Sequence, residues 1–374
     1  MRSGFQRVVI SGLGVEIPQA VITNEELVDC FNAWVNAENA KRAPAASKLS
    51  PSAAEFIVHA SGIRERRVLF ADGILDPERM APRIPARPDE QLSVQAEFGL
   101  AAANAALRDA GLAGRDIDLV ICASSHLQRM FPAVAIEIQH ALGAGGAGFD
   151  VSLGCASAAA GIHLAFNLVR SGAHRRVLVV TPEIITPNLD FRDRQTHFIF
   201  GDAAVAVVVE ASEEERPGTF VIEDTALWTQ FSNNIRSNTG YLQRTAEDDT
   251  SVVHTEGSLI RQVGNRVFKE VSHGVNRVIS EFLDAHGVGI EGVRRFWLHQ
   301  ANARMNAMIL KLALGHEADE DRAPTVLETL GNTAAAGTVI ALERHRDDLK
   351  PGEVGLLCAF GAGYSIGAAL LRKQ

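Results

Sequence analysis

The sequence predicts an α/β fold built from two duplicated halves, each made of stacked layers of helices and strands. The chain of 374 residues is longer than a usual single domain, and its 47% hydrophobic and 22% charged residues are typical of a well-cored globular protein. A single offset of 177 residues superimposes three separate segments of the chain. Each half also alternates strand-like and helix-like segments in the same order.

The repeated segments carry residues that are chemically different at equivalent positions. The aligned pairs are 118–122 with 295–299, 154–161 with 331–338, and 177–180 with 354–357. Cys122 thus maps onto His299, and Cys155 maps onto Asn332. Alanine- and glycine-rich segments align readily by chance, but the flanking apolar runs align at the same offset. Duplication is therefore the better account, and it brings equivalent loops of the two halves face to face.

The polar stretch 210–257 separates the two halves, so we expect an N-terminal half at 1–215 and a C-terminal half at 216–374. The N-terminal half carries an insertion at about 36–90. Within it, residues 36–52 and 71–90 are rich in Pro, Ala and Arg, a composition that indicates surface loops or a lid. Long insertions of this kind commonly serve binding.

Composition excludes several classes of protein. The formal net charge of -9 argues against nonspecific binding of nucleic acid. The first residues lack a signal-peptide pattern and no apolar run of 18 residues follows, which favours a cytoplasmic protein without a membrane partner. The four cysteines, Cys30, Cys122, Cys155 and Cys358, show no C-x-x-C spacing. We therefore expect no disulfide framework and no zinc site.

Cys155 is a candidate nucleophile. It follows the apolar stretch 149–153 and precedes an alanine-rich segment, 156–170, that predicts a helix. At a helix N-terminus the unpaired amides and the helix dipole favour a thiolate, which can lower a cysteine pKa from about 8.5 to roughly 3.5–7.5. A small buried core cysteine is the alternative, and the partner residues decide between the two.

His299 ends a short apolar strand, before an amphipathic helix expected at 303–314. Taken alone it could be a structural histidine, and Asn332 could be an ordinary helix N-cap. The duplication places both at loops that correspond to those of Cys122 and Cys155. Together, Cys155, His299 and Asn332 form a far more specific constellation than any one of them.

The turn at Gly361-Ala362-Gly363 follows the last buried strand of the repeat. Its small residues allow backbone amides to approach a ligand closely, as in an oxyanion hole. An ordinary tight turn is the other interpretation of this segment.

Several motifs, in order and spacing, resemble the 3-oxoacyl-[acyl-carrier-protein] synthases III. They are Ser61-Gly-Ile-Arg-Glu-Arg66, Phe131-Pro132, the segment around Cys155, Phe200-Gly-Asp202, His299-Gln-Ala-Asn302, Gly331-Asn-Thr333 and Phe360-Gly-Ala-Gly363. The resemblance spans nearly the whole chain and implies a thiolase-like, five-layered αβαβα fold and a homodimer.

The resemblance also implies a reaction that needs no metal and no bound cofactor. Cys155 takes an acyl group from acyl-CoA, with the amides of Cys155, Ala362 and Gly363 as oxyanion hole, and His299 and Asn332 then assist decarboxylative condensation with malonyl-acyl carrier protein. It implies that Phe131 and Phe268 belong to the substrate pocket, Phe131 reaching across the dimer. The longer chain resembles a branch that takes medium-chain primers.

This sequence departs from the family pattern where CoA binds. Phe56 and Ala60 stand where typical members carry a Trp and an Arg around the adenine, whereas Arg194 matches a second adenine-contacting arginine. Arg304 and Lys269, with Arg266 and Lys311, could form a basic patch for an acidic carrier protein, or a solvated helix face.

Other condensing enzymes remain as alternatives. A degradative thiolase needs a second cysteine in the final glycine-rich turn, where this chain has Gly-Ala-Gly-Tyr. An enzyme of a specialised polyketide or alkylresorcinol-type pathway, and a non-catalytic partner subunit of a synthase, stay open, although the intact set of Cys155, His299 and Asn332 argues against the latter.

Overall fold

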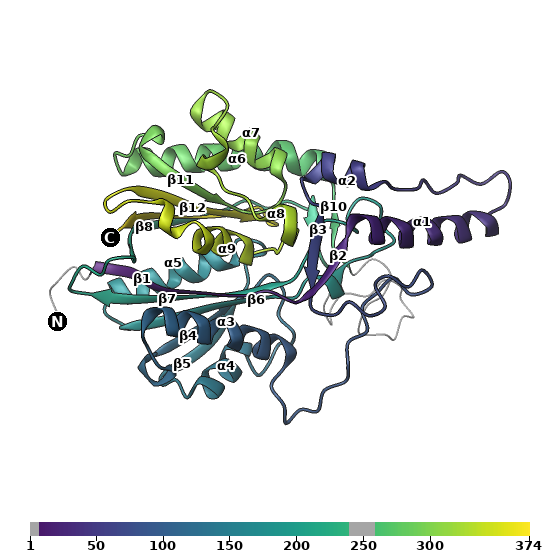
Figure 1. Cartoon of the computed structure of the whole chain (residues 1–374). Helices are drawn as coiled ribbons and strands as arrows, with labels where there is room; N and C mark the ends of the chain where they lie inside the picture. The colour runs from purple at the N-terminus through teal and green to yellow at the C-terminus, as the bar shows by residue number, and fades with distance from the viewer. Residues whose placement is uncertain (1–6, 239–258) are drawn as a thin grey trace.

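Two β-sheets form the frame of the protein, and helices lie outside and between them (Figure 1). The computed structural model describes residues 7–238 and 259–374. Within the described residues, nine strands lie side by side in the hydrogen-bonded order β11-β12-β13-β8-β1-β7-β6-β4-β5. Strands β8 and β1 are joined over only two residue pairs, Val9 with Val221 and Ile10 with Phe220. The order therefore divides into one sheet from each half of the chain.

The strands of the first sheet are β1 (Arg7–Glu16), β4 (Leu119–Ala123), β5 (Ala147–Val151), β6 (Arg176–Glu183) and β7 (Ala203–Ser212). Those of the second are β8 (Phe220–Thr229), β11 (Val293–Leu298), β12 (Val354–Gly361) and β13 (Ser365–Lys373). Two small pairs add β2 (Ala20–Thr23) with β3 (Glu65–Val68), and β9 (Ile235–Arg236) with β10 (Arg261–Gln262).

The α-helices are α1 (Asn24–Lys41), α2 (Ala54–Ser61), α3 (Val94–Ala110), α4 (Val134–Leu142), α5 (Ser157–Arg170), α6 (Gly264–Ala285), α7 (Ala303–Leu314), α8 (Leu327–Leu330) and α9 (Ala336–Arg344). Short 3-10 helices lie at Gly114–Asp116, Thr186–Asn188, Ile290–Gly292, Glu320–Arg322 and Arg346–Asp348. No helix within the described ranges is both long and apolar enough to cross a membrane.

The layers follow the order α, β, α, β, α (Figure 1). Helices α3 and α4 cover the outer face of the first sheet, and α6 and α7 cover the outer face of the second. Helices α5 and α9 lie between the sheets and contact strands of both, so the largest core cluster is built from these two helices and the inner faces of both sheets. Gly161 in α5 permits this close packing, because a Cβ there would lie 2.6 Å from Val179 Cγ1. The predicted five-layered fold is confirmed.

The two sheets repeat one pairing scheme. In the first, β4 is parallel to β6, and β6, β7 and β1 are successively antiparallel. In the second, β11 is parallel to β12, and β12, β13 and β8 are successively antiparallel. The strand order thus reads the same from either side of the β8–β1 junction, apart from the additional edge strand β5. The expected boundary near residue 215 falls between β7 and β8.

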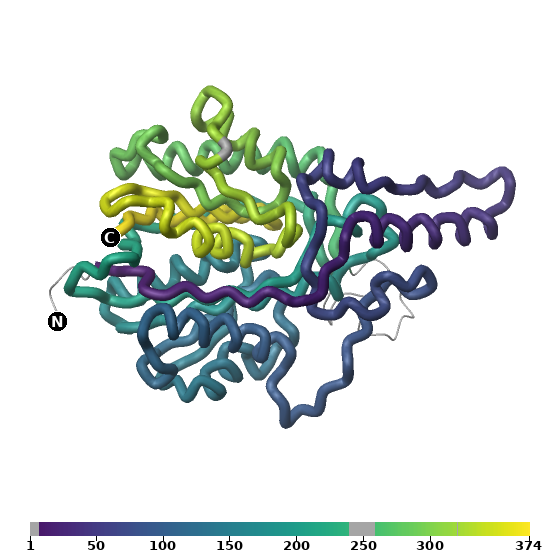
Figure 2. Tube along the Cα trace, in the orientation of Figure 1, coloured from purple at the N-terminus to yellow at the C-terminus, as the bar shows by residue number. Residues whose placement is uncertain are grey.

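The end of α1 and the chain that returns from it, about residues 36–53, form an arm that projects from the layered body (Figure 2). Helix α1 begins with a capping box between Thr23 and Glu26 and continues to Lys41, so the prediction of a loop from residue 36 was wrong for 36–41. The chain then returns along the helix, where Asn39 exchanges two hydrogen bonds with Leu49 (2.8 and 3.0 Å). Residues 42–53 and 71–92 lack regular structure, as predicted for most of the insertion.

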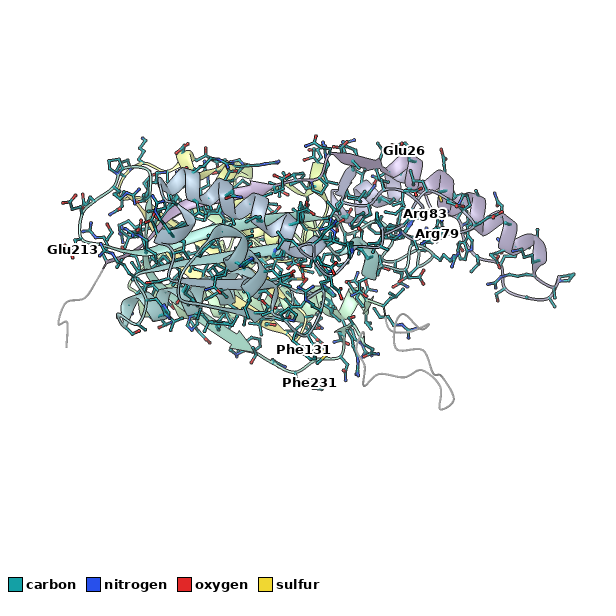
Figure 3. The ribbon with its side chains drawn as sticks, turned by 90° about the horizontal axis from the view of Figure 1, so that it is seen from below. Glu26, Arg79, Arg83, Phe131, Glu213 and Phe231 are labelled. Carbon is teal, nitrogen blue, oxygen red and sulfur yellow. The ribbon has the colours of Figure 1, made fainter. Side chains whose placement is uncertain are left out.

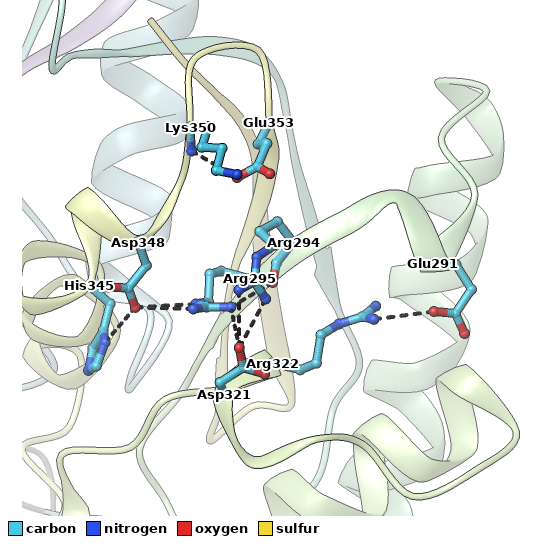
Figure 4. A network of polar contacts seen from close by, with 9 residues as sticks. All are labelled: Glu291, Arg294, Arg295, Asp321, Arg322, His345, Asp348, Lys350 and Glu353. Carbon is cyan, nitrogen blue, oxygen red and sulfur yellow. Dashed lines mark hydrogen bonds and ion pairs between the residues drawn. The ribbon is translucent and has the colours of Figure 1, made fainter.

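A network of ion pairs and hydrogen bonds connects the start of β11 to the segments that contain Asp321 and Asp348 (Figure 4). The guanidinium of Arg295, only 5% exposed, pairs with Asp348 at 3.3 Å and with Asp321 at 3.2 Å. His345 Nδ1 lies 3.0 Å from the same Asp348 carboxylate. Because the buried charge of Arg295 has two acidic partners, its desolvation is compensated.

Candidate active site

Cys155 lies two residues before α5, in the tight segment that connects β5 to this helix. Ser157 shapes the segment, since its hydroxyl accepts from Leu153 N at 2.8 Å and donates to Gly154 O at 2.6 Å. On the opposite side stands Gly361, where an added Cβ would lie 2.7 Å from Cys155 Cβ and 3.2 Å from its sulfur. The end of β12 therefore touches the nucleophile candidate directly.

The environment of the thiol has opposing effects on its pKa. Burial, and then the charge of Glu183, raise the pKa of Cys155 to about 12, whereas hydrogen bonds from the backbone amides of Cys155 and Ala362 lower it. The expectation of a thiol activated in the resting site was therefore wrong, because desolvation outweighs the helix N-terminus. The two amides that approach the sulfur are nevertheless donors of the kind that an oxyanion requires.

His299 directly follows β11, as predicted, and its backbone N–H donates to Cys358 O at 2.9 Å. Its ring packs edge-on against Phe360, with 5.2 Å between centroids. Burial lowers the pKa of His299 to about 4, against an opposing hydrogen bond with the Ala334 backbone. The imidazole is therefore neutral at pH 7 and can donate a hydrogen bond through one ring nitrogen.

Asn332 is 5% exposed and lies four residues before α9, so the interpretation as a helix N-cap was wrong. Its backbone forms an isolated parallel bridge with Phe200, in which Asn332 N donates to Ile199 O at 2.9 Å. Its side-chain oxygen accepts from Ala334 N at 2.9 Å. This loop geometry leaves the Asn332 amide nitrogen free to face a ligand, because the carbonyl oxygen is held by the backbone.

Cys155, His299 and Asn332 all line one cavity of about 480 Å³, here called the Arg194 cavity. Phe56, Ala60, Arg194, Phe268 and Arg304 also line this cavity. The Arg194 guanidinium lies over the Phe56 ring, 4.8 Å from its centroid. Arg304 Nη2 lies 2.9 Å from His59 Nε2. Most of the residues selected from the sequence are thus brought together around one space.

A second cavity of about 510 Å³, the His126 cavity, meets the first at Cys155. Its lining surface is mainly apolar and includes Ala362 and Gly363, the other members of the expected oxyanion hole. Its further lining includes Ser125, His126, Ile185, Phe200, Phe231, Ile235, Ile260 and Ala334. The thiol therefore stands between two spaces of the size that ligand pockets have.

Four residues selected from the sequence lie outside both cavities: Phe131, Lys269, Arg266 and Lys311. Phe131 is 81% exposed and points away from the single chain (Figure 3). Lys269 is exposed on α6, whereas its neighbour Phe268 lines the Arg194 cavity.

The sequence analysis missed a buried carboxylate beside the site. Glu183 is fully buried at the end of β6 and accepts from Ser125 N at 2.8 Å and from Ser125 Oγ at 2.6 Å. Ser125 Oγ also lies 2.9 Å from Nδ1 of His126. Burial raises the pKa of Glu183 to about 7. An acidic residue within an otherwise apolar strand, beside a polar loop equivalent to that of His299, was the available signal.

Comparison with known proteins agrees with this geometry. The family model for 3-oxoacyl-[acyl-carrier-protein (ACP)] synthase III matches residues 149–225, and the model for its C-terminal part matches residues 283–373. The chain is 46% identical to the beta-ketodecanoyl-[acyl-carrier-protein] synthase of Pseudomonas aeruginosa, over 93% of this chain and 100% of that protein. It is 33% identical to beta-ketoacyl-[acyl-carrier-protein] synthase III of Bradyrhizobium diazoefficiens, over 98% of each chain.

Solved structures show the same similarity. The priming beta-ketosynthase of the R1128 polyketide pathway has a TM-score of 0.78 and 28% identity, over 100% of this chain and 99% of that chain. The 3-oxoacyl-[acyl-carrier-protein] synthase III of Aquifex aeolicus has a TM-score of 0.75 and 28% identity, over 98% and 99%. By sequence identity over nearly its full length and by fold, this chain belongs to the 3-oxoacyl-[acyl-carrier-protein] synthase III family of condensing acyltransferases.

Proposed function

We propose that this enzyme loads a medium-chain acyl group from acyl-CoA onto Cys155 and condenses it with malonyl-acyl carrier protein. The observation that carries the proposal is the position of Cys155. It lines one cavity together with His299 and Asn332, and its sulfur accepts hydrogen bonds from two backbone amides. A nucleophile, two hydrogen-bonding side chains and an amide pair are the groups that acyl transfer followed by condensation needs.

In the first step the sulfur of Cys155 attacks the carbonyl carbon of the acyl thioester. The carbonyl oxygen becomes an oxyanion held by the N–H groups of Cys155 and Ala362. The carbon–sulfur bond to CoA then breaks, and the thiol proton leaves with the CoA thiolate. Because the pKa of Cys155 is about 12 in the empty site, we expect substrate binding to precede formation of the thiolate.

In the second step the malonyl thioester enters the Arg194 cavity. His299, neutral at pH 7, and the amide nitrogen of Asn332 donate hydrogen bonds to its thioester carbonyl. The carbon–carbon bond to the carboxylate breaks, carbon dioxide departs, and its electron pair forms an enolate. The enolate carbon attacks the carbonyl carbon of the acyl-cysteine and forms the new carbon–carbon bond. The bond between this carbon and the sulfur of Cys155 then breaks, and the released thiolate takes up a proton from solvent.

The His126 cavity supports a medium-chain primer. Its walls are largely apolar and its volume of about 510 Å³ adjoins Cys155, so an alkyl chain attached to the sulfur has a lined space to occupy. The name of the Pseudomonas aeruginosa relative, a beta-ketodecanoyl synthase, indicates a ten-carbon product.

A homodimer completes the proposal. Strand β5 ends the first sheet, and its outer edge has no strand partner within the described residues. Two large apolar side chains are exposed, Phe131 at 81% and Phe231 at 85%, and both lie on the same side of the molecule (Figure 3). An exposed strand edge with exposed apolar residues favours pairing with a second copy. We expect Phe131 to bound the partner's acyl pocket.

The outer part of the Arg194 cavity suits CoA and the carrier protein. Phe56 and Arg194 present a stacked aromatic and cationic surface, and Arg304 adds positive charge. Lys269 could contribute only from the surface of α6. The proposed enzyme is cytoplasmic and needs no metal or bound cofactor.

The test is intact-protein mass spectrometry after incubation with acyl-CoAs of different chain lengths. Wild type and Cys30→Ala, a control at another free cysteine, should gain one acyl group, whereas Cys155→Ala should gain none. Asn332→Ala should be acylated but should condense poorly with malonyl-acyl carrier protein. Absence of an adduct on wild type with every acyl-CoA would contradict the proposal and favour a non-catalytic partner subunit.

Chain-length preference tests Phe131. Replacement of Phe131 with Ala should shift the preferred primer towards longer chains, because it enlarges the proposed pocket of the partner. An unchanged profile in the mass-spectrometric assay would remove Phe131 from that pocket.

The second candidate is the same chemistry in a polyketide pathway. It is favoured by the similarity to the R1128 priming ketosynthase. Transfer to malonyl groups on a polyketide carrier protein, in preference to a fatty-acid carrier protein, would distinguish it.

A further inference from the structure

The turn that presents the Ala362 amide is held by hydrogen bonds from several elements. Its carbonyl oxygens are all occupied: Ala362 O accepts from Ser365 Oγ at 2.5 Å, Gly363 O from Ser232 N at 2.5 Å and Tyr364 O from Gln230 N at 2.7 Å. These bonds fix the peptide groups on which the direction of the Ala362 N–H depends.

The side chain of Tyr364 adds a second set of contacts. The ring is 6% exposed, and its hydroxyl donates to Glu270 Oε2 at 2.8 Å. Asn234 Nδ2 donates to the same carboxylate oxygen at 2.9 Å and lies 3.2 Å from the Tyr364 hydroxyl. Burial, together with the carboxylate of Glu270, raises the pKa of Tyr364, which keeps the hydroxyl protonated as a donor. We call this group the Tyr364 clamp.

The clamp is needed because the turn is not backed by solid packing. A cavity of about 370 Å³ lies beside it, lined among others by Glu270, Phe360, Gly361 and Tyr364. Phe360 and Gly361 also line the Arg194 cavity, so the end of β12 has open space on two sides. A turn flanked by cavities can relax, unless polar contacts oppose the movement.

We propose that Tyr364, Glu270 and Asn234 are positioning residues that hold the Ala362 amide at the oxyanion. The proposal rests on the proposed function of Cys155. None of the three touches the reacting atoms; they act through the turn. Their contribution is largest when negative charge develops on the carbonyl oxygen, since the amide donates to that charge and binding of acyl-CoA does not depend on it.

The expected effect on the rate follows from the indirect role of these residues in the oxyanion hole. Removal of a whole oxyanion-hole donor costs about 10²–10³ in kcat. A displaced amide retains part of its interaction, so we expect Tyr364→Phe and Glu270→Ala to lower the rate of acyl transfer about tenfold. KM for acyl-CoA should change less than about twofold. Alkylation of Cys155 by iodoacetamide, which forms no oxyanion, should fall by less than acyl transfer does, because the Ala362 amide also lowers the pKa of the thiol.

A conservative variant separates positioning from general damage. Glu270→Gln keeps an oxygen that accepts from Tyr364 and Asn234, so it should retain near wild-type acyl transfer. Glu281→Ala, an exposed position on the same helix α6, is the matched control and should behave as wild type. The double variant Tyr364→Phe with Glu270→Ala should be no slower than either single variant, because both break one clamp.

The experiment measures single-turnover acylation, KM and alkylation on the full chain. Wild-type acyl transfer in Tyr364→Phe would overturn the proposal, as would equal losses in Glu270→Gln and Glu270→Ala. Alkylation falling in parallel with acyl transfer would also overturn it, because a disordered site explains that result. Failure of the proposed function is distinct, since wild type would then form no acyl adduct at all.

Discussion

Substitution of Gly361 by alanine tests the direct contact between β12 and the nucleophile. The new Cβ would lie 2.7 Å from Cys155 Cβ, whereas ordinary contacts begin at 3.4 Å. The two segments must therefore separate by about 0.7 Å, and a misplacement of about 1 Å near reacting groups can cost about 100-fold in rate. We expect acylation of Cys155 to fall about 10- to 100-fold, with an overpacking cost of about 1–3 kcal/mol.

Rapid-quench acylation, scaled to the folded fraction from thermal unfolding, measures the effect. Gly355→Ala is the matched control in the same strand, because its Cβ would meet Trp297 Cζ3 at 2.2 Å, in the core. That variant should lose stability without loss of acylation per folded molecule. A folded Gly361→Ala protein that acylates at the wild-type rate would refute the reasoning.

Two further predictions concern charges. Glu183→Gln removes the charge that raises the pKa of Cys155. Because the pKa of Glu183 is about 7, alkylation of the thiol between about pH 7 and pH 9 should become faster, about tenfold for each unit by which the pKa of Cys155 falls. A slower or unchanged rate in this range would contradict the prediction. Asp348→Asn should destabilise the protein by about 1 kcal/mol at pH 7 in urea unfolding. Desolvation raises the pKa of Asp348, but His345 and Arg295 together lower it below its usual value. A depressed carboxyl pKa contributes stability above the unfolded pKa and loses it as the pH falls through the folded pKa. The gap between variant and wild type should therefore close below about pH 4; a constant gap would show that charge is not involved.

Sequence alone predicted the elements whose causes are local. Helix α7 covers 303–314 as its apolar period predicted, because Asn302 caps it by accepting from Arg304 N and Met305 N. The duplication, read from one offset, predicted the same order of strands and helices in both halves and the meeting of Cys155, His299 and Asn332. These features depend on periodicity and repetition, which a sequence records directly.

What the sequence could not predict depends on surroundings that only the folded chain supplies. The raised pKa of Cys155 comes from burial and from Glu183, 28 residues further along the chain. Asn332 resembled a helix cap because its pairing with the Phe200 segment is long-range. The helical end of α1 was missed because its turns from residue 36 carry few apolar residues. The roles of Phe131 and Lys269 stay predictions.

The position of Cys155 between two cavities has a consequence for the order of events. If the alkyl chain remains in the His126 cavity after transfer, the Arg194 cavity empties when CoA leaves and becomes free for the malonyl thioester. The two thioesters then enter through the Arg194 cavity one after the other, which gives double-displacement kinetics. At high concentration each substrate competes with the other for this cavity. Excess acyl-CoA should accordingly inhibit the acylated enzyme.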